Sequence, residues 1–412
     1  MAGEWPTERV GDLADSISDT HKFGKDRLIF LNTSDVLLGK ILHHSYSAVR
    51  EWPGQAKKSI QRDDILFSEI RPANGRWAYV DVDAEDYVVS TKLMVIRPRR
   101  NRVMPRFLYH FLASSETTRW LQHLAESRSG TFPQITFDQI AELELALPSL
   151  TEQANIANFL DCIDDKIELN QRMNQTLETI AQAISKSWFM DFEPFRDRGM
   201  QDSPLGEIPK GWNITDISEI GNVICGKTPP TKDPDNYNGE IPFITIPDIY
   251  NKVFVTLTTN YLSEKGAATQ SGKFLPKYSI CVSCIATPGL VSITSQPSQT
   301  NQQINSIICY KNVSPFWCYF AMKNLRDEII AGGSGGSATL NLNKGNFSKL
   351  RTIKPSPEIM QDFHEAVNPL FSRILNNECE NNTLAALRDT LLPKLISGEI
   401  RVKDAERFVE KA

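Results

Sequence analysis

The sequence predicts a mixed α/β protein built as a tandem duplication: two globular α/β blocks, each followed by a long helix of a coiled coil. Three observations predict this fold. A seven-residue apolar repeat occupies two segments, these segments recur at an offset of 207 from Pro148 to Pro355, and short β-rich runs fill the blocks. The expected order is a first block over residues 1–147, a helix over 148–195, a second block over 196–354, a helix over 355–402 and a tail over 403–412.

Composition is that of a globular protein, with 41% hydrophobic and 23% charged residues among 412. No apolar run reaches the ~18–20 residues of a membrane span, so no membrane partner is expected. The first residues lack a signal-peptide pattern, which favours a cytoplasmic location. Seven cysteines, an odd number, fit reduced thiols rather than a disulfide framework.

The net charge of −5 argues mildly against wholesale nucleic-acid binding. The acidity, however, is concentrated in the predicted helices. Residues 148–205 and 355–412 together carry 12 basic and 20 acidic side chains, whereas the second block, over 206–354, carries 14 and 10. A basic surface on the blocks therefore remains possible.

The first block begins the chain and reads as mixed α/β. Tyr87–Ile96 is rich in β-branched and apolar residues and predicts a strand. Arg106–Leu124 has helical apolar spacing and predicts an amphipathic helix.

The first long helix is predicted from a capping-box pattern at Ser149 and Glu152 to about Trp188. Some 40 residues at ~1.5 Å each span roughly 60 Å. The two apolar positions of its repeat are Ile156, Ile163, Asn170, Leu177 and Ile184, and Leu160, Ile167, Asn174, Ala181 and Trp188. Two asparagines thus stand where the pattern favours apolar residues.

The second block repeats the composition of the first. Ile241–Ile246 and Gln303–Tyr310 predict strands, and Pro315–Ile330 predicts a helix. Cys281 and Cys284 form a lone CxxC inside an apolar run, which indicates a packed strand rather than a zinc or redox site.

The second long helix is predicted over about Glu358–Ile396, with a kink or a late start at Pro369. Both asparagines recur in it at the same offset, as Asn377 and Asn381. A buried polar residue in such a seam specifies register at some cost in stability. The hypothesis is a layer of Asn170 with Asn377, and Asn174 with Asn381 beside it; alternatively, these residues face solvent or a partner subunit.

The sequence contains no recognisable catalytic or metal-binding motif. The pair His43-His44 lacks neighbouring cysteines or carboxylates in a metal-site pattern. Dinucleotide-binding, phosphate-binding and nucleophile-elbow motifs are also missing. We therefore predict no catalytic residue and no metal ligand.

Three segments carry a resemblance to a known family. The run Pro148–Asp164 resembles the central conserved helix of the specificity subunits of type I restriction-modification systems. Leu391–Arg401 resembles their C-terminal conserved segment, and Gly206–Trp212 resembles the opening of their second target-recognition domain. The resemblance covers nearly the whole chain, with the segments in the expected order.

This resemblance implies two target-recognition domains, arranged pseudo-symmetrically and joined by two long antiparallel coiled-coil helices. Each domain would read one half of a bipartite site in double-stranded DNA, while the helices fix the unread gap. Two modification subunits would methylate adenine, and restriction subunits would translocate and cleave DNA. The chain itself would bind no cofactor, since S-adenosylmethionine, ATP and Mg²⁺ belong to the partner subunits.

Polar loops in the blocks supply the candidate DNA contacts, because arginine pairs with guanine, asparagine and glutamine pair with adenine, and cations hold phosphates. The first block offers a turn and an arginine-rich loop, with Arg71, Asn74, Arg76, Arg97, Arg99, Arg100 and Arg102. The second block offers two loops, with Lys227, Lys232, Gln296, Gln299, Asn301 and Gln302. Ordinary solvated loops are the alternative in every case.

Other functions remain open at this stage. A two-headed coiled-coil scaffold that binds proteins or peptides would show no DNA affinity. A specificity subunit that supports methylation alone would have the same sequence features. The DNA target and the gap length do not follow from the sequence, because readout depends on loop geometry and DNA deformation.

Overall fold

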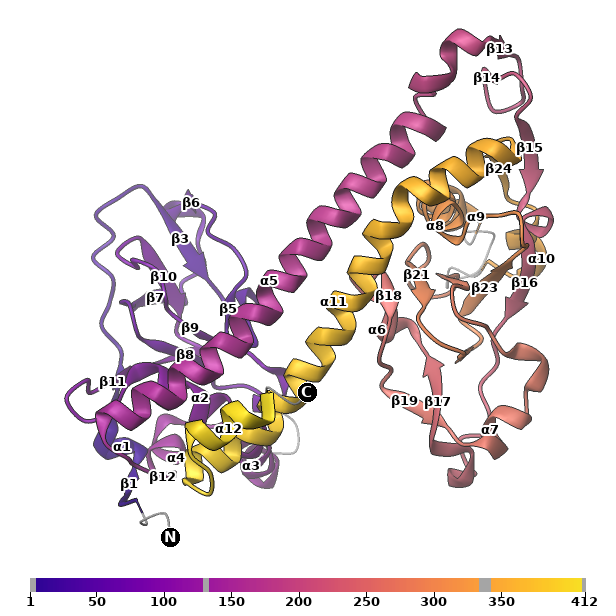
Figure 1. The fold of residues 1–412 in the computed structure, drawn as a ribbon. Helices are drawn as coiled ribbons and strands as arrows, with labels where there is room; N and C mark the ends of the chain where they lie inside the picture. Colours follow the sequence, from indigo (N-terminus) through magenta and orange to yellow (C-terminus); the bar gives the residue numbers. More distant parts are fainter. Residues whose placement is uncertain (1–4, 129–132, 333–341, 410–412) are drawn as a thin grey trace. The chain divides into compact units, whose positions relative to one another are not determined.

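The computed structural model describes residues 5–128, 133–332 and 342–409 (Figure 1). The chain divides into two compact units. Unit 1 comprises residues 1–166 and 383–412, and unit 2 comprises residues 167–382. Each unit therefore holds one block together with part of each long helix, a division that differs from the five consecutive segments expected from the sequence.

Unit 1 is built on two four-stranded sheets, of order β2-β11-β8-β9 and β6-β3-β10-β7. Its strands are β1 (Thr7–Arg9), β2 (Ala14–Ile17), β3 (Arg27–Leu31), β4 (Val36–Leu37), β5 (Lys40–Ile41), β6 (Ser47–Ala48), β7 (Ala56–Ser59), β8 (Ile65–Ser68), β9 (Trp77–Tyr79), β10 (Tyr87–Ser90), β11 (Leu93–Pro98) and β12 (Glu144–Ala146). Strand β3 pairs in parallel with β10, whereas β11 pairs antiparallel with β2 and β8. The single strand expected over Tyr87–Ile96 is thus two strands in two sheets.

Helices and short turns complete unit 1. They are α1 (Val10–Leu13), α2 (Pro105–Ala113), α3 (Ser115–Arg128), α4 (Phe137–Ala141) and α12 (Val402–Val409), with 3₁₀ turns η1 (Thr33–Asp35), η2 (Val49–Glu51) and η3 (Pro72–Asn74). The helix expected over Arg106–Leu124 is interrupted at Ser114, which is extended. The Ser114 hydroxyl accepts a hydrogen bond from the Thr117 N–H at 3.2 Å, so this residue caps the second of the two helices. The expected tail is largely the helix α12.

Unit 2 repeats this plan with a five-stranded sheet, β16-β23-β20-β21-β18, and a three-stranded sheet, β19-β17-β22. Its strands are β13 (Met200–Gln201), β14 (Ile208–Pro209), β15 (Asn213–Asp216), β16 (Gly221–Cys225), β17 (Tyr237–Ile244), β18 (Phe254–Val255), β19 (Asn260–Leu262), β20 (Ile280–Ser283), β21 (Val291–Thr294), β22 (Gln299–Thr300), β23 (Ile304–Cys309) and β24 (Arg351–Lys354). Its helices are α6 (Ile246–Ile249), α7 (Glu264–Ala268), α8 (Pro315–Asn324), α9 (Arg326–Gly332) and α10 (Lys344–Ser348), with 3₁₀ turns η4 (Glu193–Arg198), η5 (Ile217–Glu219), η6 (Pro234–Asn236) and η7 (Ser271–Lys273).

The two units share one topology. The order β2-β11-β8-β9 of unit 1 matches β16-β23-β20-β21 of unit 2. In each unit, an opening strand pairs antiparallel with the strand that precedes a long helix, as β1 with β12 and β15 with β24. The parallel pair β3 and β10 matches β17 and β22. The predicted tandem duplication is therefore confirmed by strand order.

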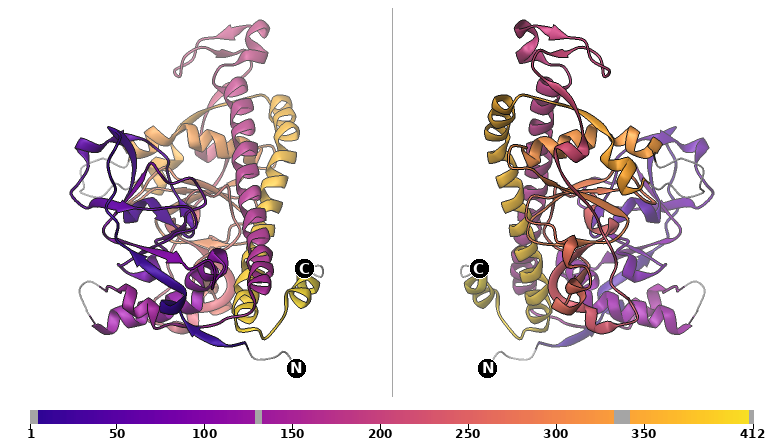
Figure 2. Two further views of the ribbon diagram at one scale, coloured as in Figure 1. Left: turned by 90° about the vertical axis from the view of Figure 1, so that its left-hand side faces the viewer. Right: turned by 90° about the vertical axis from the view of Figure 1, so that its right-hand side faces the viewer.

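The long helices are α5 (Leu150–Phe189) and α11 (Pro357–Ser397). Within each unit their segments run side by side in opposite directions (Figure 2). Helix α11 continues through Pro369, so the late start does not occur. A bend of α11 is visible a few turns after its first residue (Figure 1). Pro369 lies inside this helix, and a proline there removes one backbone hydrogen bond.

The apolar repeat is buried as predicted, since none of its ten members in α5 is exposed. It packs on the blocks as well as on the other helix. In unit 1, Ile156 and Leu160 share a core with Leu391, Leu395 and the block's own apolar residues. In unit 2, the α11 residues Phe363 and Phe371 join the core of the second block. The helices are therefore structural parts of both domains and not a separate spacer.

Two further predictions concern the interior and the membrane. Cys281 lies on β20 and Cys284 directly after it, and both are buried, which confirms the packed strand. Burial raises the pKa of the Cys281 thiol to about 12. Within the described ranges, no helix is long and apolar enough to cross a membrane.

Candidate nucleic-acid interface

The predicted turn of the first block connects β8 to β9 and contains η3. Arg71 has a left-handed backbone, with φ of 45°, and is exposed together with Asn74. The Ala73 N–H donates to Gln122 of α3 at 3.0 Å, which fixes the turn to the body of unit 1. Arg71 and Asn74 are thus presented to solvent by an anchored backbone.

Arg76 behaves differently from its two neighbours. Its guanidinium donates to the carbonyl oxygens of Ser34 at 3.0 Å and Val36 at 3.2 Å. These bonds tie the turn to the β4–β5 hairpin. Arg76 is half-buried, and its guanidinium helps to hold the backbone of the turn in place.

The arginine-rich loop after β11 is matched by carboxylates of the same unit. Arg97 makes two 2.8 Å bonds to the buried carboxylate of Asp64, and this contact raises the pKa of Arg97. The other three cations pair as Arg99 with Asp15, Arg100 with Asp63 and Arg102 with Glu8. Because each positive charge has a negative neighbour, this loop does not form the concentrated basic surface that the sequence suggested.

In unit 2, two predicted loops meet. The Lys227 N–H donates to the Thr300 carbonyl at 3.0 Å, and the Thr228 hydroxyl donates to Gln302 at 2.5 Å. A Cβ on Gly226 would lie 2.1 Å from the Asn301 carbonyl oxygen, so only glycine permits this approach. The exposed side chains of Lys227 and Gln302 therefore belong to one polar ridge.

Of the remaining predicted DNA contacts in unit 2, two are exposed and two are buried. Lys232 and Gln296 are exposed. Gln299 is completely buried, and its amide donates to the Ala267 carbonyl at 3.1 Å and accepts from Gln270 at 2.7 Å. Its expected position at the DNA surface is wrong, because β22 carries it into the sheet. Asn301 is also buried and bonds to Gln303 at 2.9 Å.

The four seam asparagines meet across the helix pair, but not in the expected pairs. Asn170 donates to Asn381 at 3.0 Å and to Glu380 at 2.8 Å. Asn377 donates to Asn174 at 2.8 Å. Asn170 and Asn377 are buried, so the alternative of free solvent-facing residues does not hold for them. The layer of Asn170 with Asn377 is wrong, because in antiparallel helices one number falls as the other rises.

Charged side chains attach α5 to each block. In unit 1, Asp161 accepts from Arg106 at 2.9 Å and from His110 at 2.8 Å. Burial alone raises the pKa of Asp161, but the contacts with His110 and Arg106 outweigh it and leave that pKa lowered. In unit 2, Glu178 accepts from Tyr319 at 2.7 Å and Lys323 at 2.6 Å. These contacts hold the helix at a defined position on each domain.

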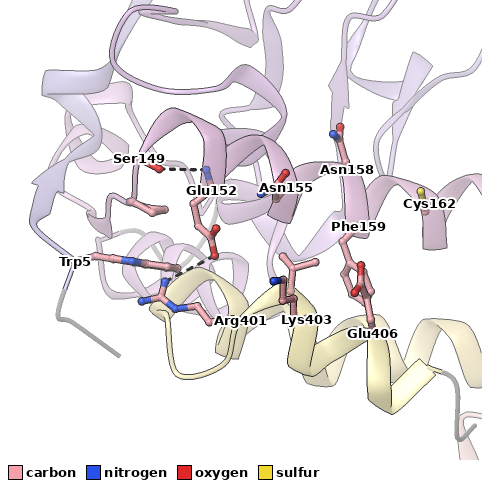
Figure 3. Close-up of a pocket in the computed structure, with 12 residues that line it drawn as sticks. Trp5, Ser149, Glu152, Asn155, Asn158, Phe159, Cys162, Arg401, Lys403 and Glu406 are labelled. Carbon is pink, nitrogen blue, oxygen red and sulfur yellow. Dashed lines mark hydrogen bonds and ion pairs between the residues drawn. The ribbon is translucent and has the colours of Figure 1, made fainter. Parts of the chain in front are cut away.

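A pocket of about 910 Å³ lies where the start of α5 faces α12 within unit 1 (Figure 3). Arg401 stacks over the Trp5 ring at 4.4 Å and approaches Glu152 at 3.8 Å. The Ser149 hydroxyl accepts from the Glu152 N–H at 3.3 Å, so only one half of the predicted capping box forms. The polar groups of this pocket are thus used to hold the two ends of unit 1 together. Among the described residues, no group of three His, Cys, Asp or Glu side chains could hold a metal ion.

Comparisons with known proteins agree with this architecture. Residues 3–179 and 209–385 each match the family model for the type I restriction modification DNA specificity domain. The chain belongs to this family. The two matched ranges correspond to the duplicated halves, and together they span most of the sequence.

Its relatives are specificity subunits. The type I restriction enzyme HindI specificity subunit of Haemophilus influenzae is 44% identical, with 96% of this chain and 100% of that protein covered. The MjaIX specificity subunit of Methanocaldococcus jannaschii is 29% identical, over 74% of this chain and 71% of that protein. The crystal structure of a type I S subunit from M. genitalium covers 95% of this chain and 96% of its own, with a TM-score of 0.57 and 15% identity, which supports the fold. The chain is thus a specificity subunit of a type I restriction-modification system.

The sequence did not single out the apolar tips of this specificity subunit. Leu38 is 65% exposed at the turn of the β4–β5 hairpin, and Tyr250 is 44% exposed after α6. A weak signal existed for the first, because Leu38-Gly39 separates the short segments Val36-Leu37 and Lys40-Ile41 as a two-residue hairpin turn does. No comparable pattern marked Tyr250.

Proposed function

We propose that this specificity subunit is the non-catalytic, sequence-reading component of its complex. Each specificity domain reads one half of a bipartite target in double-stranded DNA. The observation that carries the proposal is the duplication, in which two domains share one strand order but expose different polar loops. Two domains with the same strand framework and different loops are suited to recognise two different half-sites.

Different side chains would make the contacts in the two domains. In the first, Arg71 and Asn74 are the exposed candidates for guanine and adenine edges. In the second, Lys227 is suited to a phosphate and Gln302 to a base edge, with Lys232 and Gln296 as outer contacts. The Arg97–Arg102 loop contributes less, because carboxylates of unit 1 already neutralise it.

The helix pair would set the unread gap between the half-sites. Helices α5 and α11 each run without interruption from one unit into the other. The asparagine contacts fix how far one helix is shifted along its partner, since sliding by one turn would break them. A fixed register gives the two domains one separation along DNA.

Catalysis would be supplied by other subunits. Two modification subunits would transfer a methyl group from S-adenosylmethionine to an adenine in each half-site. Restriction subunits would use ATP and Mg²⁺ for translocation and cleavage.

The test is co-expression of the full chain with its modification subunit, followed by mapping of methylated adenines in the host genome. We expect one bipartite motif with a fixed gap. Arg71→Ala should change the first half-motif alone, and Gln302→Ala the second alone. Arg9→Ala, at an exposed arginine that pairs with Glu142 in the same unit, is the matched control and should leave both unchanged.

Two results would contradict the proposal. One is a methylation pattern that stays the same when the gene for this chain is removed. The other is a continuous motif with no unread gap. A scaffold protein that binds only proteins would give the first result.

A further inference from the structure

Two strained turns lie side by side in unit 1. Leu38, at the tip of the β4–β5 hairpin, has φ of 45°, and Arg71, in the turn after β8, also has φ of 45°. This left-handed conformation is unfavourable for residues with a Cβ, and bulky ones adopt it rarely. Leu38 and Gly39 form the two-residue turn of the hairpin, a turn that favours positive φ at both central residues, and the side chains of Leu38 and Arg71 are both exposed.

The hairpin tip is held rigidly against the second turn. The Leu38 N–H donates to the Gly75 carbonyl at 2.7 Å, and the Leu38 Cδ2 lies 2.6 Å from where a Cβ on Gly75 would be. A Cβ on Gly39 would lie 2.2 Å from the hydroxyl of Tyr109 on α2. Together with the Arg76 bonds to the hairpin, these contacts fix an exposed leucine in one orientation.

A residue at the corresponding place in the chain of unit 2 is also left-handed. In unit 1, Leu38 stands three residues after Asp35, whose carboxylate completes the capping box of η1. In unit 2, Asn251 stands three residues after Asp248, which completes the equivalent box of α6, and it has φ of 53°. The chain therefore repeats the left-handed position after the strand that begins each parallel pair.

The second strained turn is also repeated. Arg71 stands three residues after Ser68, the last residue of β8. Ala286 stands three residues after Ser283, the last residue of the matching strand β20, and it has φ of 64°. Strands β8 and β20 hold the same place in their sheets, so the two turns are equivalent.

Contacts between the two turns recur as well. In unit 2, the Tyr250 hydroxyl donates to the Thr287 hydroxyl at 3.2 Å, which joins the turn after α6 to the turn after β20. Tyr250 and Asn251 are exposed there, as Leu38 and Arg71 are in unit 1. The backbone geometry is thus shared by the two domains, whereas the side chains differ.

We infer that these paired left-handed turns are the base-reading tips of the two domains, with Leu38 beside Arg71 for the first half-site and Tyr250 with Asn251 for the second. This inference rests on the proposed function and names the side chains that decide specificity. Two domains that recognise different DNA half-sites require a common backbone geometry that carries different exposed side chains. Bulky residues that are kept in left-handed turns with exposed side chains are candidates for functional positions.

The chemistry of the tips fits base pairs. An exposed leucine packs on a thymine methyl group in the major groove or enters between base steps from the minor groove. Arg71 beside it supplies donors for guanine, and Asn251 supplies a donor and an acceptor for adenine. The Tyr250 ring offers an apolar face with a polar end.

The test uses the full complex with its modification subunits and a DNA duplex containing the mapped motif. Leu38→Ala should weaken binding at least tenfold or make the first half-motif degenerate at one or more positions, with the second half-motif intact. Leu42→Ala is the matched control, because Leu42 is 52% exposed in the same unit and is not among the left-handed residues. Leu38→Gly should keep or raise the melting temperature while losing the same readout, which separates reading from folding.

Tyr250→Ala should produce the reciprocal result in the second half-motif, with Tyr310→Ala, 48% exposed, as its control. The inference is overturned if the Leu38 and Tyr250 variants give the wild-type motif and affinities within twofold of wild type. A wild-type complex that methylates no bipartite motif would instead overturn the proposed function, so the two failures are distinguishable.

Discussion

At the scale of single residues, the helix pair is defined by polar groups in an apolar seam. Asn170 and Asn377 are buried and each donates its side-chain amide across the interface. Leucine at these positions would bury more apolar surface, so the asparagines are not chosen for stability. We propose that they restrict the helices to one alignment, because any shift would leave buried amides without partners.

Replacing Asn170, Asn174, Asn377 and Asn381 together by leucine should leave the melting temperature equal or higher, since both partners of each Asn–Asn bond become apolar and Glu380 loses only its bond from Asn170. The methylation map should then show more than one gap length. Gln171→Leu, an exposed change on the same helix, is the control and should keep a single gap. A quadruple variant with one unchanged gap would contradict the register role.

A second residue-scale feature is a buried carboxyl group on α11. Burial raises the pKa of Glu378 to about 7, although the Phe254 and Val253 N–H groups and Lys252 act to lower it, and Glu178 raises it further. Among the described residues, no donor reaches its Oε2 atom. The folded state therefore holds this carboxyl as a neutral acid at mildly acidic pH.

This group should make unit 2 less stable as pH rises. Its pKa is 4.5 when unfolded and about 7 when folded, so unfolding releases a proton between these values. The free energy of unfolding should fall through that window by roughly 3 kcal/mol and then level off. Glu378→Gln should raise the melting temperature relative to wild type at pH 8 but not at pH 4.5. An equal difference at both pH values would refute the assignment.

At the scale of elements, the end of α5 is enclosed by aromatic rings. Trp212, which opens the second block, lies 5.8 Å from Phe189, 5.7 Å from Phe192 and 5.1 Å from Phe195, measured between ring centroids. Phe192 has a left-handed backbone and turns the chain out of the helix. The aromatic residues at the end of α5 therefore pack on the second block.

Trp212→Ala should destabilise unit 2 by about 3–5 kcal/mol, because a large buried ring is removed from this cluster. The loss is measured by urea unfolding, and limited proteolysis should show faster cleavage after Phe189. Trp120→Ala, at an exposed tryptophan, is expected to change stability by less than about 0.5 kcal/mol. Equal effects of the two changes would argue against the cluster as the anchor of α5.

At the scale of the whole molecule, each long helix is shared between the units. The division falls at residues 166 and 167 in α5 and at 382 and 383 in α11. Around it, Asp164 accepts from Arg388 at 2.7 Å in unit 1, and Asn170 contacts Asn381 in unit 2. Each unit therefore has its own polar contact between α5 and α11.

Seven residues inserted after Lys166 and seven after Asn382 should lengthen the helix pair without disturbing either domain. We expect the methylated motif to keep both half-motifs and to gain at least one base pair of gap. Insertion in α5 alone shifts the two helices against each other and should abolish methylation. A double insertion that leaves the gap unchanged would contradict the proposal that the helix pair sets the gap.

The architecture could be predicted from the sequence because local residue patterns indicate it. The heptad repeat marked α5 and α11, and the recurrence of Asn170 as Asn377 revealed the duplication. The sequence predicted less well which residues of α5 pair with which residues of α11. A repeat in sequence keeps a constant difference between positions, but antiparallel helices pair positions whose numbers change in opposite senses.

The site was less predictable for a similar reason. Gln299 lies in an amide-rich run typical of a loop, yet its partner Gln270 and the strand β17 are distant in sequence. The carboxylates that neutralise the arginine loop are equally remote, as with Glu8 and Arg102. Local composition identified the polar segments, but the fold determines which of their side chains are buried or paired with carboxylates.

The sharing of helices has a consequence for biosynthesis. Unit 1 is completed by Leu391 and Leu395, which close the core over Ile156 and Leu160. About 216 residues must be translated between Lys166 and Thr383, which takes roughly 10–45 s at ~5–20 residues per second. During this interval the first half of α5 has no partner helix, and its apolar face is open to chaperones or to another nascent chain. The domain whose synthesis begins first is therefore the last to finish folding.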